Sequence, residues 1–425
     1  MAARPPPAGP LRLHGWLEPT VVGAAMVALA AGFGQFGAVA ALGDVAKSFG
    51  RLTHGATIAD QAGLSGTELG LGLAVVRLAS LGGLPVAGLA DRYGRRAVLL
   101  ITCGLGLALT LAAAASPGYW WFVAIFALGR PLLSAAASVA QVDAAEQTSA
   151  ADRAKAVALI AAGYGVGSGL TAIVHSLAGG AIGFRGVFVL AVVPLAFLPL
   201  VGRWVGEPDR FLRQAASTEH PLPVLGAVGP PYRRRLLIVA ILAFGLSIIT
   251  GPANSFLFVY AQNVRQLSGV AVAAMVAAAG AFGLAGLLAG RWLADRFGRR
   301  PTGALAMVAI AACGVLAYSG SRPGLVVGYV LGVAAGSVFA PAAGALSNEL
   351  FPTAVRASVA GWQVAAGVLG AVGGLLAFGT IADVGNRFAT AALATFLPAV
   401  LFAALFWLLP ETNGREPEDL WPTAP

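Results

Sequence analysis

The most constraining feature of this sequence is a series of long stretches without Asp, Glu, Lys or Arg. Residues 19–43 form the first, and seven others of similar length follow at 156–184, 236–264, 266–290, 301–321, 323–348, 357–382 and 388–410. A helix crosses the roughly 30 Å hydrocarbon core of a bilayer in about 20 apolar residues, so each stretch can form one span. Only 11% of the residues are charged, whereas about 25% is usual in soluble domains, and this excludes a water-soluble protein.

Three further stretches complete the set of spans. Residues 186–202 are uncharged but shorter, and residues 69–90 contain a single charge, Arg77. Residues 97–142 are long enough for two spans, which Ser116-Pro117-Gly118 separates as a turn. A membrane β-barrel would show short alternating segments instead. The sequence therefore predicts an all-α membrane protein with twelve transmembrane helices, in which the backbone groups bond internally.

Lys and Arg are distributed unequally between the two sets of connecting segments. One set, together with both termini, holds nineteen of the 27 basic residues, and the other set holds six: Lys47, Arg51, Arg185, Arg265, Arg322 and Arg387. Basic residues favour the cytoplasmic side of a membrane. We therefore expect a multi-pass protein of the cell membrane with both termini in the cytoplasm. Basic residues in loops next to the lipid bilayer account for the net charge of +9. The charge therefore does not indicate a nucleic-acid partner.

A polar stretch after the sixth span divides the chain into two sets of six helices. The predicted organisation is a cytoplasmic N-terminal tail, an N-terminal six-helix bundle, a cytoplasmic linker, a C-terminal six-helix bundle and a cytoplasmic C-terminal tail, with the bounds 1–18, 19–205, 206–234, 235–410 and 411–425. We do not expect the N-terminal segment to be a signal peptide, because the apolar run after it is far longer than a signal core of about 7–15 residues.

The two halves repeat the same landmarks. Residues 89–96 read Leu-Ala-Asp-Arg-Tyr-Gly-Arg-Arg, and residues 293–300 read Leu-Ala-Asp-Arg-Phe-Gly-Arg-Arg, an offset of 204 positions. A Glu and an Arg flank the turn after the fourth span and recur after the tenth at an offset of 203, at the positions Glu146, Arg153, Glu349 and Arg356. Arg185 and Arg387 match at an offset of 202. The halves are therefore homologous.

The stretch 88–96, Gly-Leu-Ala-Asp-Arg-Tyr-Gly-Arg-Arg, resembles the signature between helices 2 and 3 of the major facilitator superfamily of secondary transporters, and residues 293–300 resemble its second copy. Gly129-Arg130 is similar to a second motif of that family. Drug-exporting members have Gln-Gly after this Arg, whereas Leu133-Ser134 stand here, and the glycine-rich stretch 163–169 lacks their proline. The resemblance implies two pseudo-symmetric six-helix bundles that move a solute by alternating access.

We interpret the repeated turn as part of a gate. Asp91 can accept hydrogen bonds from backbone N–H groups at a helix N-terminus, where the helix dipole favours an anion. Gly94 permits a turn with positive φ. The arginines of the turn can pair with Asp143 or Glu146. The predicted gating residues are Gly88, Asp91, Arg92, Gly94, Arg95, Arg96, Asp143, Glu146, Arg153, Asp295, Arg296, Gly298, Arg299, Arg300, Glu349 and Arg356.

The resemblance adds specific partners for the two aspartates. It implies that Asp91 engages the helix start near Arg356 and that Asp295 engages the helix start near Arg153. Such contacts form when the cytoplasmic side closes and bias a two-state equilibrium. An alternative stays open, in which the arginines of these turns only set the topology and contact lipid headgroups.

Two arginines lie inside predicted spans, Arg77 in the second and Arg130 in the fourth. A charge at the centre of a span costs about 2.5–3.5 kcal/mol or more, and by default it indicates function. Neither arginine has a carboxylate at matching depth in its own span, so they favour an anionic substrate, which a guanidinium group can bind through two hydrogen bonds. The alternatives are a structural or proton-relay role for Arg130, and structural pairing or a shallower position for Arg77.

Uncharged polar residues in the spans are candidates for the same cavity. Gln35, Asn254 and Gln363 are the predicted substrate-binding residues besides the two arginines, and Tyr164, Trp362 and His175 are further candidates. The resemblance implies that the spans with Gln35 and Asn254 line the cavity. Asp44, together with Arg130, is the candidate for proton coupling.

The source of energy is constrained by what the sequence lacks. It contains no G-x-x-x-x-G-K-[ST] loop, which excludes ATP hydrolysis by this chain, and its four histidines form no cluster of the kind membrane enzymes use. Its two cysteines exclude a Cys-based metal site. We predict a monomeric transporter without cofactors, not an enzyme, which carries a small organic anion with protons as the coupling ion. The alternative is a multidrug-type proton antiporter that exports hydrophobic compounds.

Overall fold

The computed structural model describes residues 14–53, 57–149, 152–214, 226, 228–384, 387–415 and 420–421. Within these residues the secondary structure is helical, with one isolated bridge between His14 and Thr148 and no strand. The same residues contain eleven helices that are long and apolar enough to cross a membrane, and one shorter apolar helix. The prediction of an all-α membrane protein is confirmed. Most of the predicted N-terminal tail and residues 215–225 of the predicted linker lie outside the described residues.

The sixth predicted span, 186–202, is divided between two helices. α9 covers Arg153–Val189 and joins two helical segments across a kink at Gly183, where the backbone is non-helical and φ is 65°. α10 then covers Val192–Val201. The fifth span and the start of the sixth therefore appear as one long helix with a kink at a glycine, which adopts this φ without a Cβ clash.

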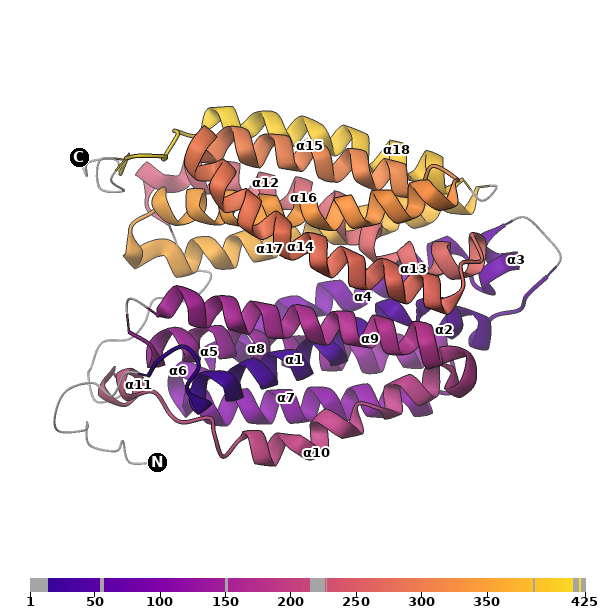
Figure 1. Cartoon of the computed structure of the whole chain (residues 1–425), viewed down its shortest axis with the longest axis horizontal. Coiled ribbons are helices and arrows are strands. Elements are labelled where there is room, and N and C mark those ends of the chain that lie inside the picture. The colour runs from indigo at the N-terminus through magenta and orange to yellow at the C-terminus, as the bar shows by residue number, and fades with distance from the viewer. Residues whose placement is uncertain are drawn as a thin grey trace. The chain divides into compact units, whose positions relative to one another are not determined.

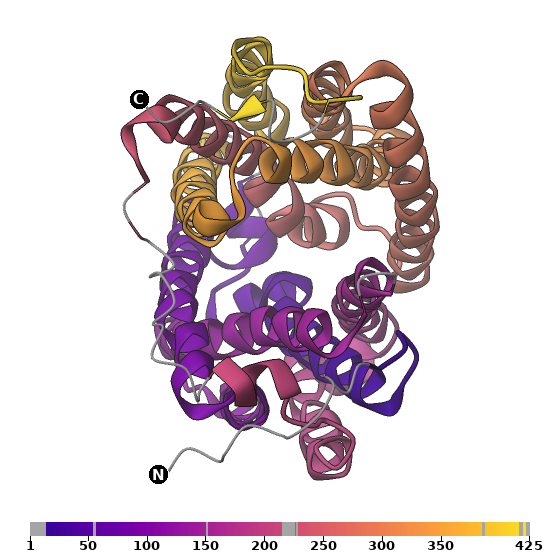
Figure 2. The ribbon, with the colours of Figure 1, turned by 90° about the vertical axis from the view of Figure 1, so that its left-hand side faces the viewer.

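The chain divides into two compact units, which are described separately. The first comprises Met1–Ala41 and Ala79–Pro221. Its helices are α1 (Pro19–Ala40), η1 (Ser80–Gly82), α5 (Gly83–Gly88), α6 (Ala90–Tyr93), α7 (Arg95–Ala112), η2 (Ala113–Ala115), α8 (Tyr119–Gln147), α9, α10 and α11 (Asp209–Gln214) (Figure 1). Figure 2 shows many of these helices nearly end-on.

The second unit comprises Leu42–Leu78 and Leu222–Pro425. Its helices are α2 (Leu42–Phe49), α3 (Ile58–Ala62), α4 (Gly66–Ala79), α12 (Pro230–Ser255), α13 (Leu257–Val259), the π-helix η3 (Tyr260–Val264), α14 (Gly269–Phe297), α15 (Arg299–Ala317), α16 (Arg322–Glu349), α17 (Thr353–Asp383), α18 (Phe388–Ala399) and η4 (Val400–Leu408). Residues 42–78 join this unit through contacts of α4 with α17. The predicted division of the chain at 206–234 stays a prediction.

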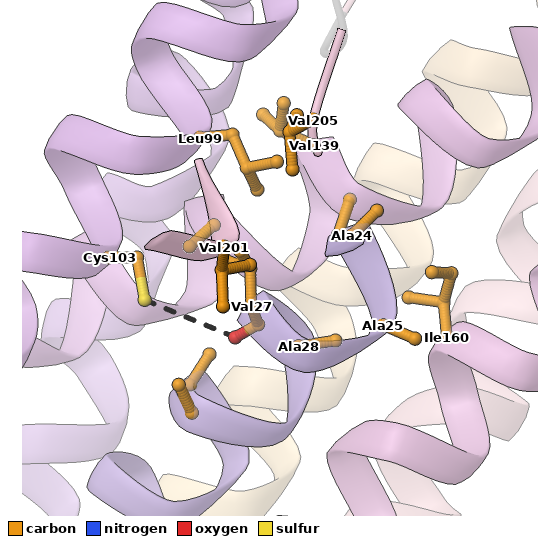
Figure 3. Packing of buried hydrophobic residues seen from close by; sticks show 14 of the residues in the cluster. Ala24, Ala25, Val27, Ala28, Leu99, Cys103, Val139, Ile160, Val201 and Val205 are labelled. Carbon is orange, nitrogen blue, oxygen red and sulfur yellow. Dashed lines mark hydrogen bonds between the residues drawn. The ribbon is translucent and has the colours of Figure 1, made fainter. Parts of the chain in front are cut away.

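Small side chains form much of the core of the first unit. Ala24, Ala25 and Ala28 of α1 are buried beside Ile160 of α9 (Figure 3). The thiol of Cys103 on α7 lies 4.0 Å from the carbonyl oxygen of Val27. Because lipid is as apolar as these side chains, close van der Waals packing between small residues has to hold the helices together. Helix α1 is accordingly buried along most of its length.

Candidate functional site

Arg130, one of the two arginines predicted inside a span, lies beside the predicted residue Gln35 in the first unit. Its Nη1 donates to the backbone carbonyl of Gln35 at 3.4 Å. The side chain of Gln35 is buried, and its Oε1 accepts the hydroxyl of Tyr164 at 3.0 Å. Helices α1, α8 and α9 therefore bring together two predicted binding residues and a further candidate, and we call these three residues the Arg130 site.

A close contact between α1 and α9 positions two members of the Arg130 site. A Cβ at Gly163 would lie 2.6 Å from the carbonyl oxygen of Ala25, and one at Gly167 would overlap the carbonyl oxygen of Leu29. The hydroxyl of Thr171 donates to the carbonyl of Phe33 at 2.9 Å across the same contact. Glycines thus let the two backbones approach closely, which sets the side chain of Tyr164 against Gln35.

The Arg130 site has unused hydrogen-bond donors. Among the described residues, neither Nε of Arg130 nor Nε2 of Gln35 has a hydrogen-bond partner, although both atoms are buried. An unpaired buried donor costs about 1–3 kcal/mol, and more when it is charged. An anion with oxygen acceptors would satisfy both donors and pair with the guanidinium group, so the site has the chemistry of a carboxylate-binding site.

The other two predicted residues of the first half lie in the second unit. Arg77 is on α4, and its side chain is half-buried. Asp44, the predicted proton-coupling carboxylate, is in the first turn of α2 and is also half-buried. Each has an interaction within the structure, so neither is an isolated buried charge.

Asn254 lines a mainly apolar cavity of the second unit. The cavity measures about 240 Å³ between α12, α15 and α16, and its polar lining includes Thr250, Tyr318, Tyr329 and Ser337. The side-chain amide of Asn254 donates to the carbonyl of Thr250 at 2.9 Å. The cavity thus places a few hydroxyl groups and an amide among apolar side chains, which is the composition of a small-molecule site.

Gln363 lines a different cavity of the second unit. This cavity measures about 460 Å³ and lies between α12, α16 and α17. The Nε2 of Gln363 donates to the hydroxyl of Ser347 at 2.9 Å. Asn254 and Gln363 are therefore not brought together. Trp362 on the same helix donates to the carbonyl of Gly226, and His175 is buried within α9.

The first copy of the repeated turn forms an ion-pair cluster. Arg95 pairs with Glu146 at 2.9 Å and with Asp91. Gly94, between α6 and α7, has a φ of 101°, as predicted for this turn. Of the two predicted carboxylate partners of the arginines, Glu146 is the one used, and the carboxylate of Asp143 accepts from Gln147 at 2.8 Å instead.

Glu207 completes this cluster, although the sequence analysis assigned it to the linker. Its carboxylate accepts the backbone N–H groups of Arg95 and Arg96, the first two residues of α7. A carboxylate at a helix N-terminus is stabilised by unpaired N–H groups and by the helix dipole. Burial outweighs these hydrogen bonds and raises the pKa of Glu207. We call Asp91, Arg95, Glu146 and Glu207 the first charge cluster.

The second copy of the turn builds the same arrangement in the second unit. Arg299 pairs with Glu349 at 3.0 Å and with Asp295 at 3.6 Å, and Gly298 has a φ of 104°. Glu411 accepts the backbone N–H groups of Arg299 at 2.9 Å and of Arg300 at 3.1 Å. We call Asp295, Arg299, Glu349 and Glu411 the second charge cluster.

The pKa of Glu411 shifts in the opposite direction from that of Glu207. Burial opposes ionisation of Glu411, but hydrogen bonds from the backbone N–H groups of Arg299, Asn413, Arg300 and Thr412 outweigh it and lower the pKa. Glu207 accepts only two such bonds from α7. The two clusters therefore share their geometry and differ in how readily the capping carboxyl gains a proton.

The remaining predicted gating residues lie around these clusters. Four of the arginines donate to backbone carbonyls: Arg96 to Gly202, Arg300 to Trp407, Arg153 to Ala145 and Arg356 to Phe351. The other two stack on aromatic rings: Arg92 on Tyr93 and Arg296 on Trp292. A Cβ at Gly88 would meet open space, so the structure gives no reason for a glycine there. The expected contacts of Asp91 near Arg356 and of Asp295 near Arg153 stay predictions.

A third helix-capping carboxylate, Asp383, lies at the C-terminal end of α17. Asp383, the last residue of α17, accepts the backbone N–H groups of Gly66 and Thr67 and the hydroxyl of Thr67, with 2.7 Å to the N–H of Thr67. Beside this cap, a Cβ at Gly66 would lie 2.7 Å from the carbonyl oxygen of Gly379. The sequence does not predict this contact, because the partners are more than 300 residues apart and no local pattern connects them.

Neither the Arg130 site nor the charge clusters resemble a metal centre. Across the part of the chain that the structure describes, no group of three or more His, Cys, Asp or Glu side chains has an arrangement that could hold a metal ion. The carboxylates of the clusters are paired with arginines and backbone N–H groups. What these sites offer is charge complementarity toward anions and mutual ion pairing.

Comparison with known proteins agrees with this arrangement. Residues 24–318 and 283–421 match the sequence model of the Major Facilitator Superfamily. A probable 4-methylmuconolactone transporter of Cupriavidus pinatubonensis is 26% identical over 376 residues, which cover 84% of this chain and 85% of that protein. A gallate transporter of Pseudomonas putida is 25% identical over 375 residues, which cover 79% of this chain and 81% of that protein. The crystal structure of a D-xylose-proton symporter has a similar fold, with a TM-score of 0.74 at 20% identity over 94% of this chain and 99% of that one.

Proposed function

Because the chain belongs to the major facilitator superfamily, we propose that it moves a small organic anion across the membrane by alternating access, with protons as the coupling ion. The family and the relatives make it a transporter and not an enzyme. Its apolar helices make it a multi-pass membrane protein. We also propose that it lies in the cell membrane with both termini in the cytoplasm.

The Arg130 site is the observation that carries the choice of an anion. A buried guanidinium nitrogen and a buried amide nitrogen lack acceptors among the described residues. A carboxylate supplies two acceptor oxygens to such donors and neutralises the charge in a medium where charge is costly. A neutral or cationic solute would leave the guanidinium group unpaired.

The names of two relatives agree with this substrate class. One is named as a gallate transporter, and gallate is an aromatic carboxylate, while the other is named for 4-methylmuconolactone. In this chain, the unused donors of the Arg130 site would hold the carboxylate of such a molecule.

The two charge clusters supply the conformational part of the proposal. Each fixes the start of one helix, α7 or α15, through a glutamate cap and an arginine ion pair. Ion pairs and caps of this kind have discrete formed and broken states, so they bias a two-state equilibrium between access to one side and access to the other. Asp91→Asn should therefore reduce transport while the protein still inserts into the membrane.

The alternative is a proton antiporter of the multidrug type that exports hydrophobic compounds. A groove of about 330 Å³ between α1, α9 and α10 favours it, because all of its lining residues are apolar and they include Met26, Phe33, Leu170, Val193 and Phe197. Such a surface binds hydrocarbon and not carboxylate.

Transport by purified protein in liposomes distinguishes the two functions. With gallate as the probe and an inward proton gradient, we expect saturable uptake by the natural chain. Arg130→Ala removes a charged hydrogen bond of about 2 kcal/mol and should weaken apparent affinity roughly 30-fold. Leu128→Ala, an exposed position on the same helix, is the matched control. Unchanged gallate uptake by Arg130→Ala would exclude the anion site, and dye transport blocked by Val193→Trp would favour the exporter.

A further inference from the structure

Asp143 on α8 is a fully buried carboxyl group, with 0% of its surface exposed. Its Oδ1 accepts the side-chain amide of Gln147 at 2.8 Å. Its Oδ2, also buried, has no hydrogen-bond partner among the residues that the structure describes. A buried carboxylate with one unbonded oxygen is costly, whereas the neutral acid is much less so.

The charged groups around Asp143 do not offset this cost. Those that act on it are Glu207, Glu146 and Arg95. The single guanidinium group, that of Arg95, already pairs with Glu146 and with Asp91. Two further carboxylates next to Asp143 repel its negative charge, so the neighbourhood favours a proton on this group.

The cationic side chains at the neighbouring helix ends bond to groups other than Asp143. On α9, Arg153 donates to the carbonyl of Ala145 and Lys155 pairs with Asp152. On α7, Arg96 donates to the carbonyl of Gly202. Among the described residues, Asp143 therefore forms no ion pair with an arginine or a lysine.

The second unit shows that the fold does not need this carboxyl group. The offset of 203 between Glu146 and Glu349 places Leu346 and Leu350 at the positions equivalent to Asp143 and Gln147. Both leucines are buried, with 2% and 0% exposed. The second charge cluster nevertheless has the same arginine pairs and the same glutamate cap. A hydrogen-bonded Asp–Gln pair in place of two leucines is thus an addition to the first unit that packing does not explain.

A short segment lies against the pair. Residues 205–211 follow α10, and the carbonyl of Gly206 accepts the amide of Gln147 at 3.3 Å. Val205 and Phe211 in this segment are buried, and the Phe211 ring lies 5.5 Å from the guanidinium carbon of Arg95. Glu207 in the middle of the segment caps α7. If this segment moved away, the cap of Glu207 on α7 would break and Asp143 would become exposed at the same time.

We propose that Asp143 binds a proton on Oδ2 while residues 205–211 cover it, and releases that proton to water when the segment moves away. In the release step the Oδ2–H bond breaks, its electron pair stays on the oxygen, and the proton passes to a water molecule. The carboxylate that remains is then hydrated. The inference rests on the proposed proton coupling, for which Asp143 would be the carrier in place of the half-buried Asp44.

Infrared spectroscopy of the full chain in lipid tests the protonation directly. We expect the natural protein to show the stretching band of a protonated carboxyl group at neutral pH, and Asp143→Asn to lose that band. The double substitution Asp143→Leu with Gln147→Leu copies the second unit, so it should fold and lose the band as well. Asp152→Asn, which removes a carboxyl group paired with the exposed Lys155, is the control and should keep it. An unchanged carboxyl band in both Asp143 variants would overturn the proposal.

Transport assays test the coupling role separately. Asp143→Asn in liposomes should still exchange labelled for unlabelled gallate but lose accumulation driven by a proton gradient. Accumulation at the natural level by this variant would overturn the coupling role. If the natural protein exchanges gallate without responding to a proton gradient, the proposed coupling fails, and the infrared result still decides whether Asp143 holds a proton.

Discussion

The carboxylate of Glu207 accepts the backbone N–H of Arg95, the first residue of α7, and Glu411 stands in the same relation to Arg299, the first residue of α15. The two glutamates are 204 positions apart, the offset of the repeated turn. In both places a Cβ on the glycine before the arginine would lie within 2.8 Å of the glutamate, so the positive-φ glycine and the capping carboxylate form one unit.

The opposite pKa shifts of these caps predict opposite pH dependence of stability. The pKa of Glu411 is lower in the fold than its ordinary value of 4.5, so its stabilisation is present above 4.5 and is lost as the pH falls through the lower value. The pKa of Glu207 is raised, so its contribution declines as the pH rises from 4.5 through the higher value.

Melting temperatures measured against pH should therefore separate the two variants. Glu411→Gln should lower the melting temperature at neutral pH by on the order of 2 °C and flatten its fall in acid. Glu207→Gln should remove the decline above pH 4.5 instead. Identical pH profiles for both variants would contradict the assignment of opposite shifts.

Tyr164→Phe tests the geometry of the Arg130 site without removing charge. The hydroxyl of Tyr164 is the donor to Oε1 of Gln35, and its loss leaves that buried oxygen without this bond. A buried hydrogen bond contributes about 1 kcal/mol, so we expect apparent gallate affinity to fall roughly fivefold with little change in maximal rate. Ser168→Ala, whose hydroxyl bonds backbone carbonyls one turn along α9, is the control. Equal effects of both substitutions would indicate a general disturbance of α9.

The sequence predicted the parts of these sites that repeat or that stand out chemically. Gly94 has the predicted positive φ, and a Cβ there would also lie 2.8 Å from the carboxylate of Glu207. Arg95 pairs with Glu146, one of its two predicted partners, because both lie at the same end of adjacent helices. The length of each apolar stretch predicted a transmembrane helix, because the thickness of the bilayer sets the number of residues that a span needs.

The missed contacts join segments that are distant in sequence and irregular in structure. Glu207 lies between α10 and α11, and Glu411 lies beyond η4, in stretches interpreted as linker and tail. A signal for them was available, since each is next to a proline and they share the offset of the turns. The cap of Asp383 on α4 had no such signal, because hydrophobic periodicity identifies a helix but not its neighbour.

Asp383→Asn should loosen the start of α4. The carboxylate holds the N–H groups of Gly66 and Thr67, and loss of its charge weakens a helix-dipole interaction of about 0.5–1 kcal/mol. Hydrogen exchange of the backbone amides at 66–67 should then accelerate about two- to fivefold. Thr380→Ala, which removes bonds internal to α17, should leave this exchange unchanged. Unchanged exchange in Asp383→Asn would mean that glycine packing alone holds the two helices.

Gly167→Ala tests whether the contact of α1 with α9 sets the Arg130 site. A Cβ at Gly167 would overlap the carbonyl oxygen of Leu29, so the helices must separate to accept it, whereas a Cβ at Gly165 would meet nothing within 4 Å. Gly165→Ala is the matched control, and in a helix this change is expected to stabilise by about 0.5–1 kcal/mol. Gly167→Ala should instead destabilise by about 1–3 kcal/mol, as overpacking does.

The same substitution should act on function through Tyr164, one turn before Gly167 on α9. Separation of the helices lengthens the bond from Tyr164 to Gln35, so gallate affinity should fall at least as far as in Tyr164→Phe. Melting temperature and gallate uptake measured on both alanine variants provide the check. If a destabilised Gly167→Ala protein kept the wild-type affinity for gallate, the Arg130 site would hold its geometry without this contact.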